Sequence, residues 1–123
     1  MTTKTITKDA VREVKESRID FFERVWNIVA QIPRGRVTTY GHIAAALGAR
    51  SSSRMVGWAM NYAHAHPWIP AHRVINRNGE LSGKMHFATP TLMRELLDAE
   101  DVEFNDERVR LDKHLWIPEV GVW

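Results

Sequence analysis

The sequence has 123 residues and a mass of 14.2 kDa, the size of one small domain that can bury its own hydrophobic core. It contains no cysteine, which excludes disulfides, thiolate metal sites and a cysteine nucleophile. No apolar run approaches membrane-spanning length and the N-terminus lacks the apolar core of a signal peptide, so we expect a soluble, intracellular protein.

The formal net charge of +2 conceals an asymmetry along the chain. Residues 1–33 carry six basic and five acidic side chains (+1), and residues 34–84 carry seven basic and one acidic (+6). Residues 85–123 carry four basic and nine acidic side chains (−5). A polyanion would therefore meet the middle third of the chain first.

The first strong pattern is a helix predicted to begin at Asp20. Apolar residues recur at helical spacing from there, and Asp20 and Glu23 have the spacing of a capping box. Pro33 and Gly35 are expected to end this helix. The preceding residues, 1–18, are polar and charged, and we expect them to form an N-terminal arm or a short helix.

A helix-turn-helix is predicted next. Thr39 is placed to cap a short helix that Gly48 closes, and a second helix is expected over residues 53–63 after a small-residue turn. Arg50 and Arg54 lie at the start of the second helix, where backbone N–H groups also favour phosphate. The residues of this helix expected to face the core are Met55, Val56, Ala59, Met60 and Ala63.

A loop stiffened by Pro67 and Pro70 follows and presents Ala71, His72 and Arg73. After it, residues 74–81 are predicted to form a β-hairpin, because an Asn-Gly pair at 78–79 separates two short segments. A hairpin after a helix-turn-helix is a wing, and its tip would carry Arg77, with Lys84 on the return.

The last third is predicted to hold one more helix and one more hairpin. Thr89 and Pro90 resemble a cap and a first-turn proline, followed by Leu92, Met93, Leu96 and Leu97 on the inner face. Residues 102–104 and 108–111 are expected to pair, and residues 114–118 to pack back as an apolar tail. The predicted fold class is mainly α with a small β wing, a winged helix-turn-helix-like domain over residues 19–118, with a C-terminal tail at 119–123.

Several motifs in this order resemble the DNA-binding domain of the O6-alkylguanine-DNA alkyltransferases. They are Gly-Arg-Val-Thr-Thr-Tyr-Gly (35–41), Arg-Met-Val-Gly-Trp-Ala-Met (54–60), Ile-Pro-Ala-His-Arg-Val (69–74), Ser-Gly (82–83) and Leu-Leu-Asp-Ala-Glu (96–100), and together they cover roughly residues 19–104. In those enzymes the loop reads Pro-Cys-His-Arg-Val and the cysteine accepts the alkyl group.

This chain has Ala71 at the position of that cysteine. A methyl side chain cannot act as a nucleophile. The sequence is therefore most similar to the alkyltransferase-like proteins, the non-catalytic branch of the family, and its Trp116-Ile117-Pro118 is similar to their Trp-x-Pro tail. We also expect no separate N-terminal domain of the kind that many alkyltransferases carry, which favours this branch.

The resemblance implies roles for the DNA-facing residues. Arg54 matches the arginine finger that fills the space left by a flipped nucleotide, and Tyr40 matches the tyrosine that helps rotate the phosphate. The second helix would lie in the minor groove, where Gly57, Ala59 and Ala63 suit close approach. We expect Trp58, which stands where many relatives have a small residue, to lie in the core; if exposed, it could wedge against the sugar-phosphate edge.

The resemblance also implies an alkylguanine pocket. Its lining would be Pro70, Ala71, the backbone of Val74, and the loop formed by Ser82, Gly83 and Lys84. Lys84 would either reach the modified oxygen or contact a phosphate. His72 and Glu100 match the relay that deprotonates the cysteine, and they are interpreted as a retained hydrogen-bonding scaffold. Arg73 would brace the loop through backbone carbonyls.

The function implied is a non-enzymatic sensor of O6-alkylguanine in duplex DNA that flips the base and flags it for nucleotide excision repair proteins. We expect a monomer without cofactor or metal, located at the nucleoid or in the nucleus according to its source.

Two alternatives stay open: an alkyltransferase whose cysteine was changed to alanine, and a winged-helix transcription regulator. A metal site at His64, His66 and His72, or a hydrolase built on Ser53 or Ser82, is disfavoured because neither has the required spacing or motif.

Overall fold

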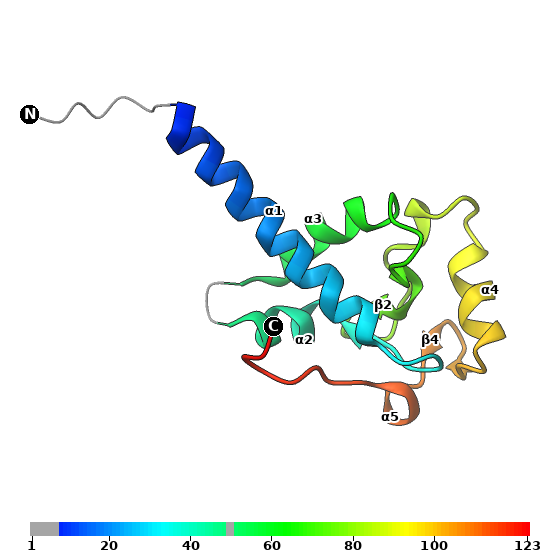
Figure 1. Cartoon of the computed structure of the whole chain (residues 1–123). Coiled ribbons are helices and arrows are strands. Elements are labelled where there is room, and N and C mark those ends of the chain that lie inside the picture. The colour runs from blue at the N-terminus through cyan, green and yellow to red at the C-terminus, as the bar shows by residue number, and fades with distance from the viewer. Residues whose placement is uncertain (1–7, 49–50) are drawn as a thin grey trace, which may run out of the picture.

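The computed structural model describes residues 8–48 and 51–123, with side chains from residue 18 onward. Helices dominate the fold and two very short sheets join them (Figure 1), which confirms the predicted mainly helical class. No helix in these ranges is long and apolar enough to cross a membrane.

The elements in chain order are α1 (Lys8–Gln31), β1 (Thr38–Thr39), α2 (Tyr40–Leu47), α3 (Ser53–Ala63), the 3-10 helix η1 (Ala71–Arg73), β2 (Val74–Ile75), the 3-10 helix η2 (Lys84–His86), α4 (Leu92–Ala99), β3 (Phe104–Asn105), β4 (Arg108–Val109) and α5 (Leu111–His114).

Helix α1 is longer than the sequence pattern suggested. It runs without a break from Lys8 to Gln31, and its N-terminal part projects away from the other elements (Figure 1). The predicted start at Asp20 is wrong, because Asp20 lies inside the helix and has no free first turn to cap. The predicted end before Pro33 is confirmed. Among its described side chains, Val25, Ile28 and Val29 lie in the core, followed by Ile32 directly after the helix.

The helix-turn-helix forms as predicted from α2 and α3. Thr39 Oγ1 accepts a hydrogen bond from the His42 backbone N–H at 3.1 Å, which caps α2. Gly48 ends that helix at φ +103°, a left-handed conformation that favours glycine. Ser52 caps α3 by accepting from the Met55 N–H at 3.1 Å. Helix α3 packs against both α1 and α2, so its outer face is fixed in position.

The predicted wing hairpin is wrong. Residues 76–79 do form a turn, with Gly79 at φ +82°, but β2 pairs with no return strand in the described part of the chain. It pairs instead in parallel with β1, placing Val74 opposite Thr38. The Asn76 side chain accepts from the N–H groups of Asn78 and Glu80 at 3.0 and 2.8 Å, and so replaces the bonds of a strand ladder.

The C-terminal third largely follows the prediction. Helix α4 begins at Leu92, two residues later than expected. Thr91 takes the N-cap position in place of Thr89, and its hydroxyl donates to Glu95 at 3.0 Å. Strands β3 and β4 form the expected antiparallel pair. The tail packs back as expected, since the Trp116 N–H donates to the Val37 carbonyl at 2.7 Å. Arg24 donates two further bonds to the Trp123 carbonyl.

Candidate nucleic-acid interface

The loop that carries Ala71 lies between α3 and α4. Ala71 begins η1 and is 9 % exposed, and its surface contributes to a hollow of about 480 Å³, hereafter the Ala71 hollow. The hollow is open to solvent and is bordered by both prolines of the loop. Its lining also includes His64, His72, Ile69, Phe87 and Leu96.

A hydrogen-bonded network fixes this loop from behind. Glu100 accepts from His72 Nε2 at 2.6 Å and from the backbone N–H of Gly35 at 3.2 Å. Arg73 donates to both Glu100 oxygens at 3.0 and 2.9 Å and to the Ile32 carbonyl at 2.9 Å. The structure therefore places Arg73 on a carbonyl, as the sequence predicted, and adds an ion pair with Glu100 that it did not predict.

The network holds Glu100 in its charged form. Burial by itself raises the pKa of this carboxyl, but the hydrogen bonds from Arg73, His72 and Gly35 outweigh it and lower the pKa to about 2. Because the carboxylate is the form that accepts these bonds, the network is assembled at neutral pH. Because the chain contains no cysteine, the arrangement stabilises the loop and has no thiol to activate.

The outer face of α3 carries a row of exposed side chains, Arg54, Trp58 and Tyr62, spaced four residues apart. The Arg54 guanidinium carbon lies 5.5 Å from the centre of the Trp58 ring, so the cation stacks on the indole. The expectation that Trp58 lies in the core is wrong, since it is 50 % exposed and Tyr62 is 61 % exposed. Val56 and Met60 take the inner face instead.

Gly57 lies on the same outer side of α3. A Cβ built on it would have no neighbour within 4 Å, so nothing in the protein requires glycine there. Ala59 and Ala63, by contrast, are fully buried. The expectation that they allow close approach of a minor groove is therefore wrong, and Gly57 alone is available for it. Arg50 lies outside the described residues.

A second hollow of about 260 Å³ opens beside Arg54, hereafter the Arg54 hollow. Tyr40, Gly57, Ser82 and Gly83 contribute to its lining. Burial raises the pKa of Tyr40, and a hydrogen bond with Ser82 offsets part of this. A Cβ on Gly83 would lie 3.3 Å from the Tyr40 hydroxyl, so glycine lets the two segments approach.

The predicted pocket residues are thus divided between two hollows. Pro70 and Ala71 line the first, and Ser82 and Gly83 line the second. Val74 is 1 % exposed and lies beneath the loop. Lys84 lies away from both, in a groove that it shares with Glu80 and Arg94.

Both hollows are lined by His64, which was named above only as a disfavoured metal ligand, and by Phe87, which no sequence motif indicated. Their rings meet at 4.7 Å with an angle of 87°, and His86 stacks on His64 at 5.8 Å. Burial and the neighbouring His86 lower the pKa of His64. No local motif marks these residues, because they come from the end of α3 and from the segment after η2. Within residues 8–48 and 51–123, no group of three or more acidic or histidine side chains is arranged to hold a metal.

A capped helix pair with a cationic, aromatic outer face beside a hollowed loop defines a helix-turn-helix DNA-binding domain. Comparison with known proteins gives the same class: residues 20–102 match the family described as 6-O-methylguanine DNA methyltransferase, DNA binding domain. The chain belongs to this family, within its alkyltransferase-like branch.

Individual relatives show how far the similarity extends. Alkyltransferase-like protein 1 of Schizosaccharomyces pombe is 35 % identical over 104 residues, which cover 80 % of this chain and 96 % of that protein. The DNA base-flipping protein of Escherichia coli is 36 % identical over 107 residues, 85 % of this chain and 80 % of that protein. The crystal structure of S. pombe Atl1 in complex with damaged DNA containing O6-carboxymethylguanine superposes with a TM-score of 0.69 at 34 % identity, over 81 % of this chain and 97 % of that one.

Proposed function

We propose that this protein is a non-enzymatic sensor that binds O6-alkylguanine in duplex DNA and leaves the adduct intact. The observation that carries this proposal is the Glu100 network around Ala71. Each of the three guanidinium nitrogens of Arg73 donates to a partner and His72 Nε2 pairs with Glu100, in a chain that contains no cysteine. A loop that is held rigid without a nucleophile is suited to recognition and not to alkyl transfer.

The proposed recognition uses α3 as the element that enters the minor groove. Arg54 would occupy the space vacated by the flipped base, because a planar guanidinium can both stack and hydrogen-bond. Its contact with Trp58 supports this role, since the ring holds the cation on the outer face of the helix before DNA arrives. Tyr40 would turn the phosphate of the flipped nucleotide.

The flipped base would then have to pass from the Arg54 hollow to the Ala71 hollow. His64 and Phe87 line both, so they stand between the side where the base leaves the duplex and the loop that would receive it. Phe87 is only half-buried and follows the short η2 segment, and a rotation of its ring would join the two hollows. A wider joined pocket would admit larger O6 substituents.

The bound lesion would be passed to nucleotide excision repair proteins. A protein that binds an alkylated base without removing it contributes to repair only when another system excises the damage. The name of the E. coli relative, a DNA base-flipping protein, and the damaged-DNA complex of Atl1 support the recognition step.

The proposal is tested by binding followed by recovery of the DNA. An O6-methylguanine duplex is saturated with protein, the complex is dissociated, and the DNA is digested and analysed by mass spectrometry. We expect full recovery of the modified nucleoside and an unchanged protein mass. A protein mass increased by a methyl group, with matching loss from the DNA, would contradict the proposal.

The main alternative is an alkyltransferase inactivated by alanine at position 71. The Ala71→Cys variant distinguishes the two, because His72 and Glu100 are already placed as a relay beside this position. Rapid stoichiometric demethylation by that variant would favour the alternative. Tight binding without transfer by the same variant would support a sensor.

A further inference from the structure

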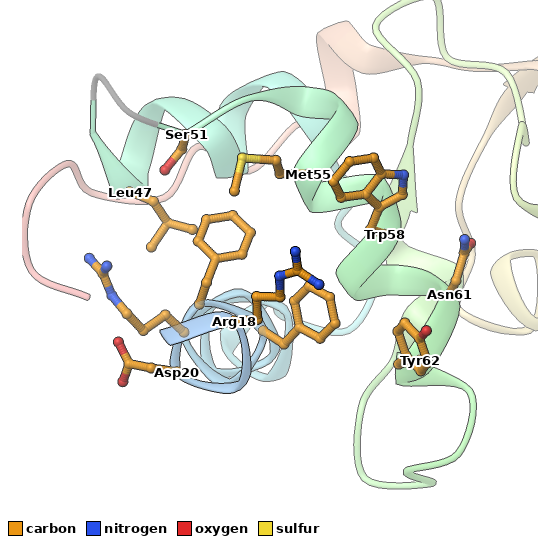
Figure 2. Close-up of a pocket in the computed structure, with 11 residues that line it drawn as sticks. Arg18, Asp20, Leu47, Ser51, Met55, Trp58, Asn61 and Tyr62 are labelled. Carbon is orange, nitrogen blue, oxygen red and sulfur yellow. The ribbon is translucent and has the colours of Figure 1, made fainter. Parts of the chain in front are cut away.

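A third hollow lies on the opposite side of α3 from the Ala71 loop, between α3 and α1. Its volume is about 890 Å³, larger than either hollow described above, and Figure 2 shows side chains from both helices surrounding it. The α1–α3 groove is defined by its lining residues, Arg18, Asp20, Phe21, Phe22, Arg24, Leu47, Ser51, Met55, Trp58, Asn61 and Tyr62. Its size is in the range of sites for small organic ligands and is ample for one nucleotide.

Aromatic rings form much of the groove. The rings of Phe22 on α1 and Tyr62 on α3 stack on each other at its edge, with centres 5.4 Å apart and an angle of 28°. Trp58 lies one turn before Tyr62 on α3, and both are half exposed or more, at 50 % and 61 %. Exposed, oriented rings of this kind are what unpaired nucleobases stack on, whatever the base.

Charge and polarity in the groove also suit a nucleotide. Arg18 and Arg24 supply two cations against one acid, Asp20. Arg24 is held in place by its two bonds to the Trp123 carbonyl at 3.0 and 2.8 Å, so it stands at the groove with its position fixed. Asn61 adds an exposed amide, which can pair with the edge of a base.

The α1–α3 groove is continuous with the DNA-facing side of the protein. Trp58 and Asn61 line both this groove and the Arg54 hollow, so a ligand lying along α3 at Arg54 reaches the groove without leaving the surface. This continuity favours the DNA itself as the occupant. A separate protein partner would have to share Trp58 and Asn61 with the DNA.

We propose that the α1–α3 groove binds one unpaired nucleotide of the DNA that flanks the lesion. Its base would stack on Tyr62 and Trp58, and its phosphate would lie at Arg18. The inference rests on the proposed function for where the DNA lies, and it adds a second nucleotide site, distinct from the Ala71 hollow, that responds to distorted or bulged DNA near an alkylated guanine.

The test uses duplexes that contain O6-methylguanine and one unpaired thymine at successive positions on either side of it. Affinity is measured against the fully paired duplex. We expect one position to raise the affinity about tenfold, the contribution of a stacked base. In Tyr62→Ala this gain disappears, and in Tyr62→Phe, which keeps the ring, it remains. Ile117→Ala, at another exposed apolar residue, serves as the control and keeps the gain.

A second readout makes the result independent of overall affinity. With 2-aminopurine as the unpaired base, stacking in the groove quenches its fluorescence with the unmodified protein and not with Tyr62→Ala. An affinity that no unpaired position increases, or a gain that survives in Tyr62→Ala, would overturn the groove proposal. The ratio of affinities for O6-methylguanine and guanine in paired duplexes is measured in parallel. If that ratio falls to one, the proposed function is contradicted. The response to the unpaired base can still be measured in that case, so the two proposals fail separately.

Discussion

The Glu100 network and the outer face of α3 organise their charged groups in opposite ways. Glu100 lies with a side chain 9 % exposed and is bonded by His72, Arg73 and Gly35, so its charge is fully used within the protein. Arg54 is exposed. Within the described residues its guanidinium makes no hydrogen bond or ion pair, and it stacks on the Trp58 ring. The first region fixes a shape, and the second offers a cation to a ligand.

Under the proposed function, the contrast separates recognition of the damaged base from alkyl transfer. His72 and Glu100 match the proton relay of the alkyltransferases. Here they hold η1 in place between α1 and α4. Arg54, which is expected to contact DNA, makes no hydrogen bond or ion pair within the described residues and adds little to the fold. Stability and DNA binding should therefore respond to different substitutions, and each prediction below tests that separation.

The largest effect is expected from Glu100→Gln. An amide cannot carry the charge that Arg73 and His72 face, and removing one partner of a buried ion pair leaves the other uncompensated. We expect the free energy of unfolding to fall by about 3 kcal/mol. Chemical denaturation measures it, with Glu95→Gln, an exposed change on α4, as the control. An unchanged midpoint would show that the network does not hold the loop.

The same carboxyl predicts a pH dependence. Its pKa is about 2 in the folded protein against an ordinary value of 4.5, so its stabilisation is present above pH 4.5 and is lost as the pH falls toward 2. The difference in stability between the unmodified protein and Glu100→Gln should therefore shrink over that window. Urea unfolding at a series of acidic pH values measures it, and a constant difference would contradict the assignment.

Arg54→Ala is expected to act on DNA binding alone. Loss of the stacking cation should weaken binding of an O6-methylguanine duplex by about 2 kcal/mol, roughly thirtyfold, with no change in the melting temperature. Arg54→Lys keeps the charge without the planar group and should recover only part of the affinity. Arg108→Ala, an exposed arginine on β4, is the control. Equal losses of affinity in Arg54→Ala and Arg108→Ala would show that the effect comes only from the change in net charge.

Gly57→Ala gives the smallest and most selective change. No atom lies near its Cβ position, and alanine favours a helix interior, so the fold should gain about 0.5 to 1 kcal/mol. The added methyl group points from the face expected to approach the minor groove, so binding should weaken severalfold. Thermal unfolding and fluorescence anisotropy on one preparation show both effects. Unchanged binding would place the DNA elsewhere on α3.

The sequence predicted what depends on local pattern. The cap at Thr39 and the bounds of α3 follow from short motifs, and the pairing of His72 with Glu100 follows from the family resemblance. The cap at Ser52 and the ion pair of Arg73 with Glu100 were not predicted. The prediction failed where a distant segment competes with local pattern. The Asn-Gly turn did not make a hairpin, because β1 takes the pairing edge of β2 and the Asn76 side chain satisfies the donors of the turn.

The pocket shows the same limit. Gly83 and Lys84 are neighbours in the sequence but line different hollows, because η2 begins at Lys84; Ser82 contributes to both. Trp58 was expected in the core because of its size, but the small residues Ala59 and Ala63 fill the contact of α3 with α1 and leave no room for it. Packing of this kind depends on which helices meet, and a single helical pattern does not specify that.

The central claim, recognition of the alkylated base without its repair, is tested most directly by one ratio. Dissociation constants are measured for two duplexes of the same sequence, one with guanine and one with O6-methylguanine at a single position, at one moderate salt concentration. We predict tighter binding of the modified duplex, by about tenfold or more. Equal affinity for the two duplexes would contradict the account.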